Sequence, residues 1–250
     1  MLLLWYTYIA FSMLNLKVRL KAVTRGKMME DKNFIKVYFA DFSVFDEATI
    51  SARICEISEE RRARIEKAAR METKLELLAS GLLAKKAVSI VFGIENPEFV
   101  KNEFGKPYIA GHTNCFFNIS HSGKRVICAL SDSECGVDIE KIEAPAQMDM
   151  IASRFFSIYE RNAIMLSANP VEAFTRLWTL RESYVKMRGK GFDIPLASLS
   201  CTFPHGKAHI CEYGKVQEDA VFNEIRDICG YRASVCALGE KNFSFEKTEI

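Results

Sequence analysis

The sequence of 250 residues lacks several features that would place it in familiar classes. Its eight cysteines include no C-x-x-C pair, so neither a zinc cluster nor a thioredoxin-type motif is indicated. The glycine-rich G-x-x-x-x-G-K-[ST] phosphate loop is also missing, which disfavours a P-loop phosphotransferase. The formal net charge is only +2, so the composition gives no sign of bulk nucleic-acid binding.

The chain also has no Gly/Ser-rich linker and no low-complexity tract. With 49% hydrophobic and 26% charged residues, it can bury a sizeable core in one or two domains. Cys115, Cys128 and Cys236 lie in apolar, strand-like runs. They are typical of reduced, buried cysteines, so we expect a reducing, cytoplasmic location rather than a disulfide framework.

Two acidic residues stand out in Gly136-Val137-Asp138-Ile139-Glu140. In a strand, alternate side chains share a face, so Asp138 and Glu140 lie together while Val137 and Ile139 can be buried. The two acids are then roughly 6.5–7 Å apart along the strand. This spacing suits two oxygen ligands of one Mg²⁺. The alternative is an edge strand with a solvated acidic face.

A long helix is predicted about forty residues later, at 170–189. Asn169 can cap it, Pro170 takes its first position, and Gly189 ends it. Glu182 and Lys186 lie one turn apart on the same stripe as Trp178. By itself, this pattern also fits a Glu–Lys surface pair of little energetic consequence.

Three strands are predicted within residues 115–142. Two β-rich runs flank a Ser-His-Ser-Gly-Lys-Arg turn at 120–125, and the strand with the acid pair follows. We expect this meander to bring Ser120 and His121 into one sheet with Asp138 and Glu140. Ser157 and Glu160 have capping-box spacing. The remaining expected elements are a strand at 34–40, helices at 46–56, 59–92 and 148–167, and a strand-rich region at 198–239.

These motifs, in this order, carry a resemblance to a known family. G-K-P, F-N-I-S-H-S-G, G-V-D-I-E, F-F-S-x-x-E and L-W-T-L-R-E-S-Y-V-K-x-x-G-K-G resemble the motifs of the Sfp-type 4′-phosphopantetheinyl transferases. The resemblance spans roughly residues 33–240. It implies transfer of the 4′-phosphopantetheine arm of coenzyme A (CoA) to a serine of an apo acyl or peptidyl carrier protein. Adenosine 3′,5′-bisphosphate is the expected product, and Mg²⁺ the expected cofactor.

The resemblance also implies roles for individual residues. Asp138, Glu140 and Glu182 are similar to the family's catalytic acids and Mg²⁺ ligands, and the identity of the general base stays open. In an ungapped comparison Glu76 stands where a basic residue is usual, with Lys74 close by, which is a departure from the pattern. The residues similar to the family's CoA contacts are Lys186, His121, Ser120, Lys106, Arg61 and Arg64. Arg61 and Arg64 lie on a charged helix whose solvated face is an equally simple explanation.

The fold implied by the resemblance is α+β, with two pseudo-symmetric α/β halves and the active site at their seam. We expect halves at residues 28–135 and 136–250, and a monomer. Residues 1–16 are almost wholly apolar, but they fit neither a signal peptide nor a spanning helix of about 20 residues. Residues 1–27 are therefore predicted to be an extension outside the catalytic fold, or a short membrane-associated anchor without stable insertion. The alternative function is a non-catalytic CoA- or carrier-protein-binding relative.

Overall fold

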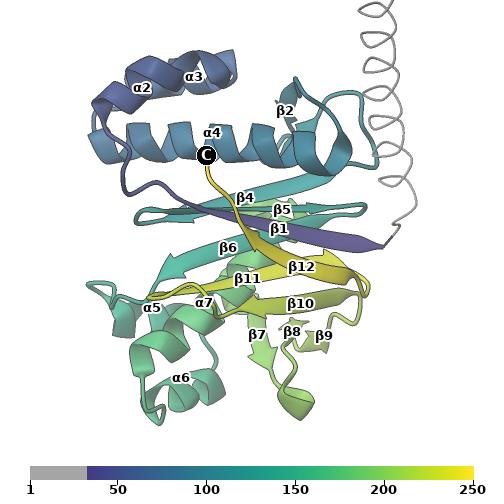
Figure 1. The fold of residues 1–250 in the computed structure, drawn as a ribbon. Helices are drawn as coiled ribbons and strands as arrows, with labels where there is room; N and C mark the ends of the chain where they lie inside the picture. Colours follow the sequence, from purple (N-terminus) through teal and green to yellow (C-terminus); the bar gives the residue numbers. More distant parts are fainter. Residues whose placement is uncertain (1–32) are drawn as a thin grey trace, which may run out of the picture.

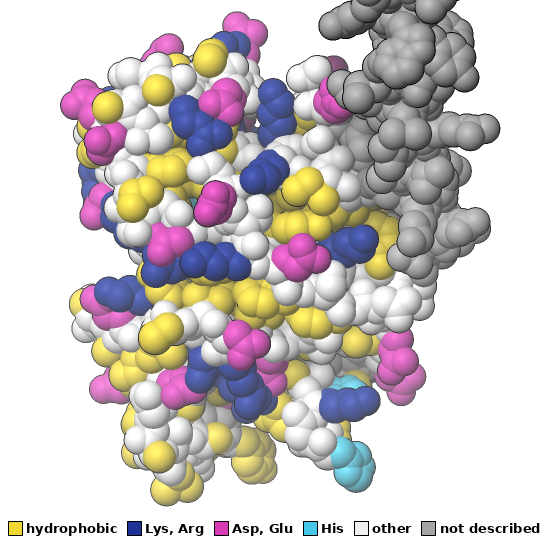
Figure 2. Space-filling model, viewed as in Figure 1, with side chains coloured by type: hydrophobic (Ala, Val, Ile, Leu, Met, Phe, Trp, Pro, Cys, Tyr) yellow, Lys and Arg dark blue, Asp and Glu magenta, His cyan; other side chains and the backbone are white. Residues whose placement is uncertain are grey.

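The computed structural model describes residues 33–250, so the extension predicted at residues 1–27 lies outside the described part. Figure 1 shows four layers: helices α2–α4, a first sheet, a second sheet, and the helices α5–α7. Figure 2 shows the same face with basic and acidic side chains interspersed, and a band of hydrophobic side chains across its middle. Within residues 33–250, no helix is both long and apolar enough to cross a membrane.

The first sheet has the strand order β12-β1-β5-β4. β4 and β5 form the predicted hairpin, with Ser122 paired to Arg125 around the turn. β5 is antiparallel to both neighbours, and β12 is parallel to β1. The bounds are β1 (Phe34–Asp41), β4 (Phe116–Ser122), β5 (Arg125–Ser131) and β12 (Asn242–Lys247).

The strand with the acid pair belongs to a second sheet, of order β10-β11-β6. The expectation that Ser120 and His121 share one sheet with Asp138 and Glu140 is therefore wrong. β5 already pairs with β1 on one edge and with β4 on the other, so β6 cannot pair with the strand that precedes it and pairs with β11 instead. The bounds are β6 (Cys135–Lys141), β10 (Ala220–Ile225) and β11 (Tyr231–Leu238).

A core of apolar side chains joins the two sheets face to face. Alternation along each strand sends every second residue into this core, which is the pattern expected of packed sheets. On β6, the inward residues are Cys135, Val137 and Ile139, each 0% exposed. Gly136, Asp138 and Glu140 consequently lie on the opposite face, against α7. The first sheet contributes Ile35, Val37, Phe39, Ile127 and Ala129, and the second sheet adds Ala233, Val235 and Ala237.

The helices α2 (Glu47–Arg53), α3 (Glu59–Lys67) and α4 (Met71–Phe92) cover the other face of the first sheet. The single helix predicted at 59–92 is wrong, because Ala68 and Arg70 have extended backbone with ψ of 128° and 133°. No glycine or proline marks this break. Folding back lets Ile65 of α3 enter the same core as α4, so tertiary packing overrides local helix propensity.

The helices of the second half confirm two predicted starts. α7 (Pro170–Arg188) is capped by Asn169 and ends at Gly189, whose φ is 66°. α6 (Ile158–Met165) begins with the Ser157–Glu160 capping box. The helix predicted at 148–167 is in fact two, because α5 (Met148–Phe155) ends before α6 starts. The remaining strands are β2 (Phe99–Lys101), β3 (Pro107–Ile109), β7 (Leu199–Thr202), β8 (His209–Glu212) and β9 (Lys215–Val216).

Gly136 lets α7 lie directly on β6. A Cβ atom at this position would be 2.1 Å from the backbone oxygen of Ser183 and 2.2 Å from the backbone nitrogen of Met187. Neither atom can move without moving the helix, so only glycine fits. The residue thus fixes how closely the polar stripe of α7 approaches the acidic face of β6.

We expect Gly136→Ala to lower the free energy of unfolding by about 3 kcal/mol or more, because the added methyl forces α7 off β6. Urea unfolding followed by circular dichroism measures this loss. Gly81→Ala is the comparison variant, since its Cβ would meet side-chain atoms, with Cγ2 of Ile57 at 2.7 Å, rather than the backbone of a packed helix. Equal losses in the two variants would contradict the role given to Gly136.

Candidate functional site

Asp138 is a buried carboxylate at the centre of the site. It is 2% exposed, and its Oδ1 accepts hydrogen bonds from Ser120 Oγ at 2.9 Å and Lys186 Nζ at 2.5 Å. Its Oδ2 is also buried, yet finds no hydrogen-bond partner within residues 33–250. A buried, partnerless carboxylate oxygen is costly, so this atom is suited to bind a cation.

The charge of Asp138 affects the pKa values of two further carboxylates. Burial and the nearby Asp138 raise the pKa of Glu140 to about 7, although Ser122 Oγ donates a hydrogen bond to it at 2.8 Å. Burial and Asp138 also raise the pKa of Glu182, while Lys186 opposes the shift. These shifts place three acids, from β6 and α7, in one electrostatic neighbourhood. A bound cation would relieve their repulsion.

The acids do not yet form a complete ligand set. Across residues 33–250, no group of three or more His, Cys, Asp or Glu side chains is arranged to hold a metal ion. Instead, the ammonium group of Lys186 lies against Asp138. The assignment of Asp138, Glu140 and Glu182 as Mg²⁺ ligands therefore stays a prediction. Their oxygen donors and the partnerless Asp138 Oδ2 fit that ion.

Side chains of β4 connect the two halves beside these acids. Asn118, Ser120 and Ser122 share one face of β4, and we call them the β4 ladder. Asn118 Oδ1 accepts a hydrogen bond from the backbone nitrogen of Val137 at 3.0 Å, and Ser122 Oγ accepts one from that of Lys141 at 3.1 Å. Within the described chain, the β4-facing edge of β6 has no strand partner, so these side chains replace the missing backbone ladder.

The β4 ladder also holds the acids themselves. Ser120 donates to Asp138, and Ser122 donates to Glu140. The roles of Asn118 and Ser122 were missed from the sequence. The N-x-S-x-S alternation, with polar residues on one face of an otherwise apolar strand, was the available signal.

His121 projects from the opposite face of β4, toward the N-terminal helices. It lines a cavity of about 470 Å³ together with Arg61 and Arg64. Its Nδ1 lies 3.8 Å from an Oε2 of Glu76, on α4. Burial lowers the pKa of His121, and the Glu76 carboxylate opposes that shift. The structure thus brings the three predicted CoA-binding residues His121, Arg61 and Arg64 to one cavity.

Arg61 is the least neutralised cation of this cavity. Its guanidinium donates to the backbone oxygen of Leu77 at 3.4 Å, and none of the carboxylates within residues 33–250 forms an ion pair with it. Burial lowers its pKa. Arg64, by contrast, is 3.7 Å from Glu60. A half-buried arginine without an ion-pair partner among the described residues favours an anionic ligand.

A second cavity, of about 300 Å³, adjoins the first. Glu182, Lys186 and Asn118 line it. Gly105, Pro107 and Ile119 line both cavities, so the two are neighbours along the boundary between the halves. We call the pair the seam groove. We call the end lined by Glu182 the acidic end, although Lys106 and Lys186 also line it, and the end at Arg61 the basic end.

Lys106 is placed differently from its predicted role. It is 7% exposed, pairs with Glu134, and donates from Nζ to the backbone oxygen of Met187 at 2.8 Å. Asn102 donates to the backbone oxygen of Gly189 at 2.9 Å beside it. Lys106 therefore holds the C-terminal end of α7. Its contact with CoA stays a prediction, and its present partners do not favour it.

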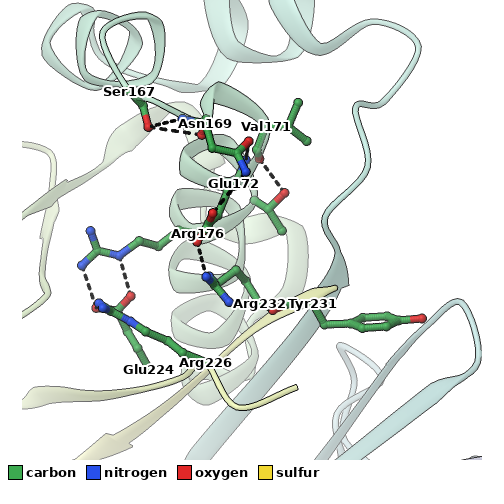
Figure 3. A network of polar contacts seen from close by, with 10 residues as sticks. Ser167, Asn169, Val171, Glu172, Arg176, Glu224, Arg226, Tyr231 and Arg232 are labelled. Carbon is green, nitrogen blue, oxygen red and sulfur yellow. Dashed lines mark hydrogen bonds and ion pairs between the residues drawn. The ribbon is translucent and has the colours of Figure 1, made fainter. Parts of the chain in front are cut away.

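Two further ion-pair networks hold α7. Near its N-terminal end, Arg232 binds Glu172, and Arg176 binds Glu224 at 2.7 Å, as Figure 3 shows. In its middle, Arg181 is 0% exposed and donates to both carboxylate oxygens of Glu160 at 2.7 Å. These pairs lie beside a cavity of about 620 Å³ that none of the three acids of the site lines.

Burial alone would raise the pKa of Glu160, but Arg181 and hydrogen bonds from Cys201 and Ser157 lower it. Glu160 is thus more than a helix cap, because it also fixes the residue next to Glu182. Together, these networks join α7 to β11, β10 and α6 along its N-terminal half and middle.

Family models match both halves of the chain. The model described as "4′-phosphopantetheinyl transferase, N-terminal" matches residues 46–133. The model of the 4′-phosphopantetheinyl transferase superfamily matches residues 134–236, which include all three acids and Lys186.

Curated relatives carry names of the same kind. The chain is 33% identical to the 4′-phosphopantetheinyl transferase gsp of Aneurinibacillus migulanus over 203 residues, covering 78% of this chain and 82% of the relative. It is 31% identical to the 4′-phosphopantetheinyl transferase Sfp of Bacillus subtilis strain 168, covering 72% and 82%. Another 4′-phosphopantetheinyl transferase of Bacillus subtilis is 34% identical over 58% of this chain, and the match spans 65% of that relative, just under two thirds.

The raised pKa of Glu140 predicts how stability depends on pH in metal-free buffer. The folded chain keeps this proton up to about pH 7, whereas the pKa of a free glutamate side chain is 4.5. Between these values the folded state binds more protons than the unfolded state, so the free energy of unfolding falls as pH rises.

The glutamine of the Glu140→Gln variant cannot ionise. The free energy of unfolding of this variant, relative to wild type, should therefore rise by about 1–2 kcal/mol between pH 5 and pH 8. Thermal unfolding at several pH values in chelator checks this gain. Glu103→Gln, at an exposed glutamate, is the control and should show no such trend. A constant difference between Glu140→Gln and wild type would refute the raised pKa.

Proposed function

Because the chain belongs to the 4′-phosphopantetheinyl transferase superfamily, with Sfp-type relatives, we propose that it transfers the 4′-phosphopantetheine arm of CoA to a serine of an apo carrier protein. The acceptor is an acyl or peptidyl carrier protein, the cofactor is Mg²⁺, and adenosine 3′,5′-bisphosphate is released. The observation that carries the proposal is the buried Asp138, with one oxygen on Lys186 and the other without a partner.

Mg²⁺ would be held by Asp138, Glu140 and Glu182, and when bound it would neutralise charge on the CoA diphosphate. Other residues of the chain hold these three acids in position. Ser120 and Ser122 of the β4 ladder fix the two acids of β6. Gly136 sets the distance to Glu182 on α7. Such preorganised charges need no rearrangement during the reaction.

Lys186 supplies the positive charge for the phosphates. Lys186 lines the seam groove, and its Nζ donates hydrogen bonds to Asp138 Oδ1 at 2.5 Å and to Ser120 Oγ at 3.0 Å. A flexible four-carbon stem lets the ammonium turn from the carboxylate toward a diphosphate oxygen without leaving the site. Lys186 then balances the charge that develops as the phosphorus is attacked.

The serine hydroxyl must lose its proton as its oxygen bonds to the phosphorus and the bond to adenosine 3′,5′-bisphosphate breaks. Glu140 and Glu182 are the candidate bases, since both have raised pKa values, to about 7 for Glu140. A carboxylate with a pKa near neutrality is ionised in part and still basic enough to accept a proton.

The two ends of the seam groove match the two charged regions of CoA. We assign the diphosphate to the acidic end with Lys186. The 3′-phosphate then lies at the basic end, where Arg61 has no carboxylate ion pair among residues 33–250 and His121 and Arg64 line the same cavity. Ser120 joins the two ends, since it precedes His121 on β4 and binds Asp138.

The proposal includes a monomer in a reducing, cytoplasmic compartment. All eight cysteines lie in the described residues and are free, which supports that compartment. The alternative, a CoA- or carrier-binding relative without turnover, is disfavoured because the sequence contains all three acids and the lysine.

We expect Asp138→Asn to lower transfer at least a hundredfold, because a neutral amide cannot replace the buried carboxylate beside the phosphates. Mass spectrometry of apo-carrier proteins incubated with CoA and Mg²⁺ measures the transfer. Asp227→Asn, at an exposed turn, is the control. Transfer by Asp138→Asn at the wild-type rate would refute the site. CoA binding by the wild-type chain without transfer to any carrier would favour the non-catalytic alternative.

Lys186→Ala and His121→Ala should each raise the Kd for CoA about tenfold, because each removes a phosphate partner. Binding of the carrier protein should change little. Calorimetry with CoA and with apo-carrier protein separates the two effects, and Lys207→Ala, at an exposed turn, serves as the control. Unchanged CoA affinity in both variants would exclude these residues from the phosphate sites.

A further inference from the structure

An acidic side chain reaches the basic end of the seam groove. Glu76 extends from α4 to within 3.8 Å of His121 Nδ1, and its side chain is 25% exposed. It is the residue at which the sequence departs from the family pattern. The contact with His121 places this departure beside the cavity assigned to the 3′-phosphate.

The charges around this cavity are close to balance. Three cations line it: Arg61, Arg64 and Lys101. Glu60 already binds two of them, since it is 2.8 Å from Lys101 and 3.7 Å from Arg64. With Glu76 added, three positive charges face two negative ones when His121 is neutral. A phosphate monoester brings a charge of about −1.5 to −2 at pH 7, so this end of the groove is poorly matched to it.

Glu76 acts at short range on whatever His121 binds. Its carboxylate takes one side of the imidazole, which leaves the other ring nitrogen for a ligand. With a hydrogen bond of about 2.8 Å to that nitrogen, a phosphate oxygen would lie roughly 8 Å from the Glu76 carboxylate, on the other side of the imidazole ring. A like charge at that distance is worth on the order of tenfold in affinity. Arg61 offsets this repulsion only in part.

We propose that Glu76 relaxes selection for the 3′-phosphate, so that the enzyme also uses 3′-dephospho-CoA as a donor. This inference rests on the proposed function. The chemistry is unchanged at the reacting phosphorus. The serine oxygen bonds to it, the bond to the leaving phosphate breaks, and the serine proton goes to the carboxylate base. The second product is then adenosine 5′-monophosphate in place of adenosine 3′,5′-bisphosphate.

The experiment compares kcat/KM for CoA and for 3′-dephospho-CoA, with one apo-carrier protein that the wild-type chain modifies. We expect the wild-type preference for CoA to be no more than about tenfold. Glu76→Gln should raise the ratio of kcat/KM for CoA to kcat/KM for 3′-dephospho-CoA about five- to tenfold, and Glu76→Lys should raise it further. The gain should come from a lower KM for CoA, while the values for 3′-dephospho-CoA change little.

Glu72→Gln, one turn earlier on α4 and exposed, changes the net charge equally and should leave the ratio unchanged. Thermal unfolding establishes that the Glu76 variants are folded. An unchanged ratio in both Glu76 variants, equal changes for both donors, or a strong wild-type preference for CoA overturns the inference.

The Kd values for the two donors, measured by calorimetry in the same variants, separate this inference from the proposed function. If the wild-type chain binds CoA but transfers nothing, the proposed function fails. The Kd ratio still decides on Glu76 in that case, because the selectivity argued here is a property of the ground-state complex.

Discussion

The contact between α7 and β6 at Gly136 is the constraint on which the rest of the site depends. A helix backbone lies where a side chain would otherwise stand, with Ser183 and Met187 over the glycine. Only at this separation can Lys186 of α7 reach the carboxylate of Asp138, two residues after Gly136 on β6. The same contact explains why Asp138 is buried rather than solvated, and why its charge raises the pKa values of Glu140 and Glu182.

A buried acid in such a place needs compensation, and the molecule provides it from two directions. The β4 ladder approaches from the first half and Lys186 from the second. Lys186 neutralises one carboxylate, while the pKa values of the other two are raised. The site therefore combines a positive charge with two carboxylates that can accept a proton, which is the combination that the proposed phosphoryl transfer to a neutral hydroxyl requires.

Much of this was accessible from the sequence, because local rules govern it. The caps of α6 and α7, the hairpin before Arg125 and the alternation that exposes Asp138 each depend on a few adjacent residues. The break after Lys67 was not accessible, since tertiary packing makes it, whereas the capping box at Ser157 and Glu160 was a local signal for the break after Phe155. The departure of β6 from the first sheet follows from β5 having both edges paired, which no local pattern records. The ionic role of Lys106 likewise depends on the end of α7, far along the chain.

The strand β12 is synthesised last but belongs to the first sheet. It lies at residues 242–247, after the whole second sheet, yet it pairs with β1 from Phe34 to Phe39. Beyond it, Thr248 donates to the backbone oxygen of Phe39, and Lys86 of α4 reaches the backbone oxygen of Glu249. Until these residues emerge, β1 has an unpaired edge, and such edges recruit other strands. The first sheet can be completed only after the second has been made, so the two halves mature together rather than in succession.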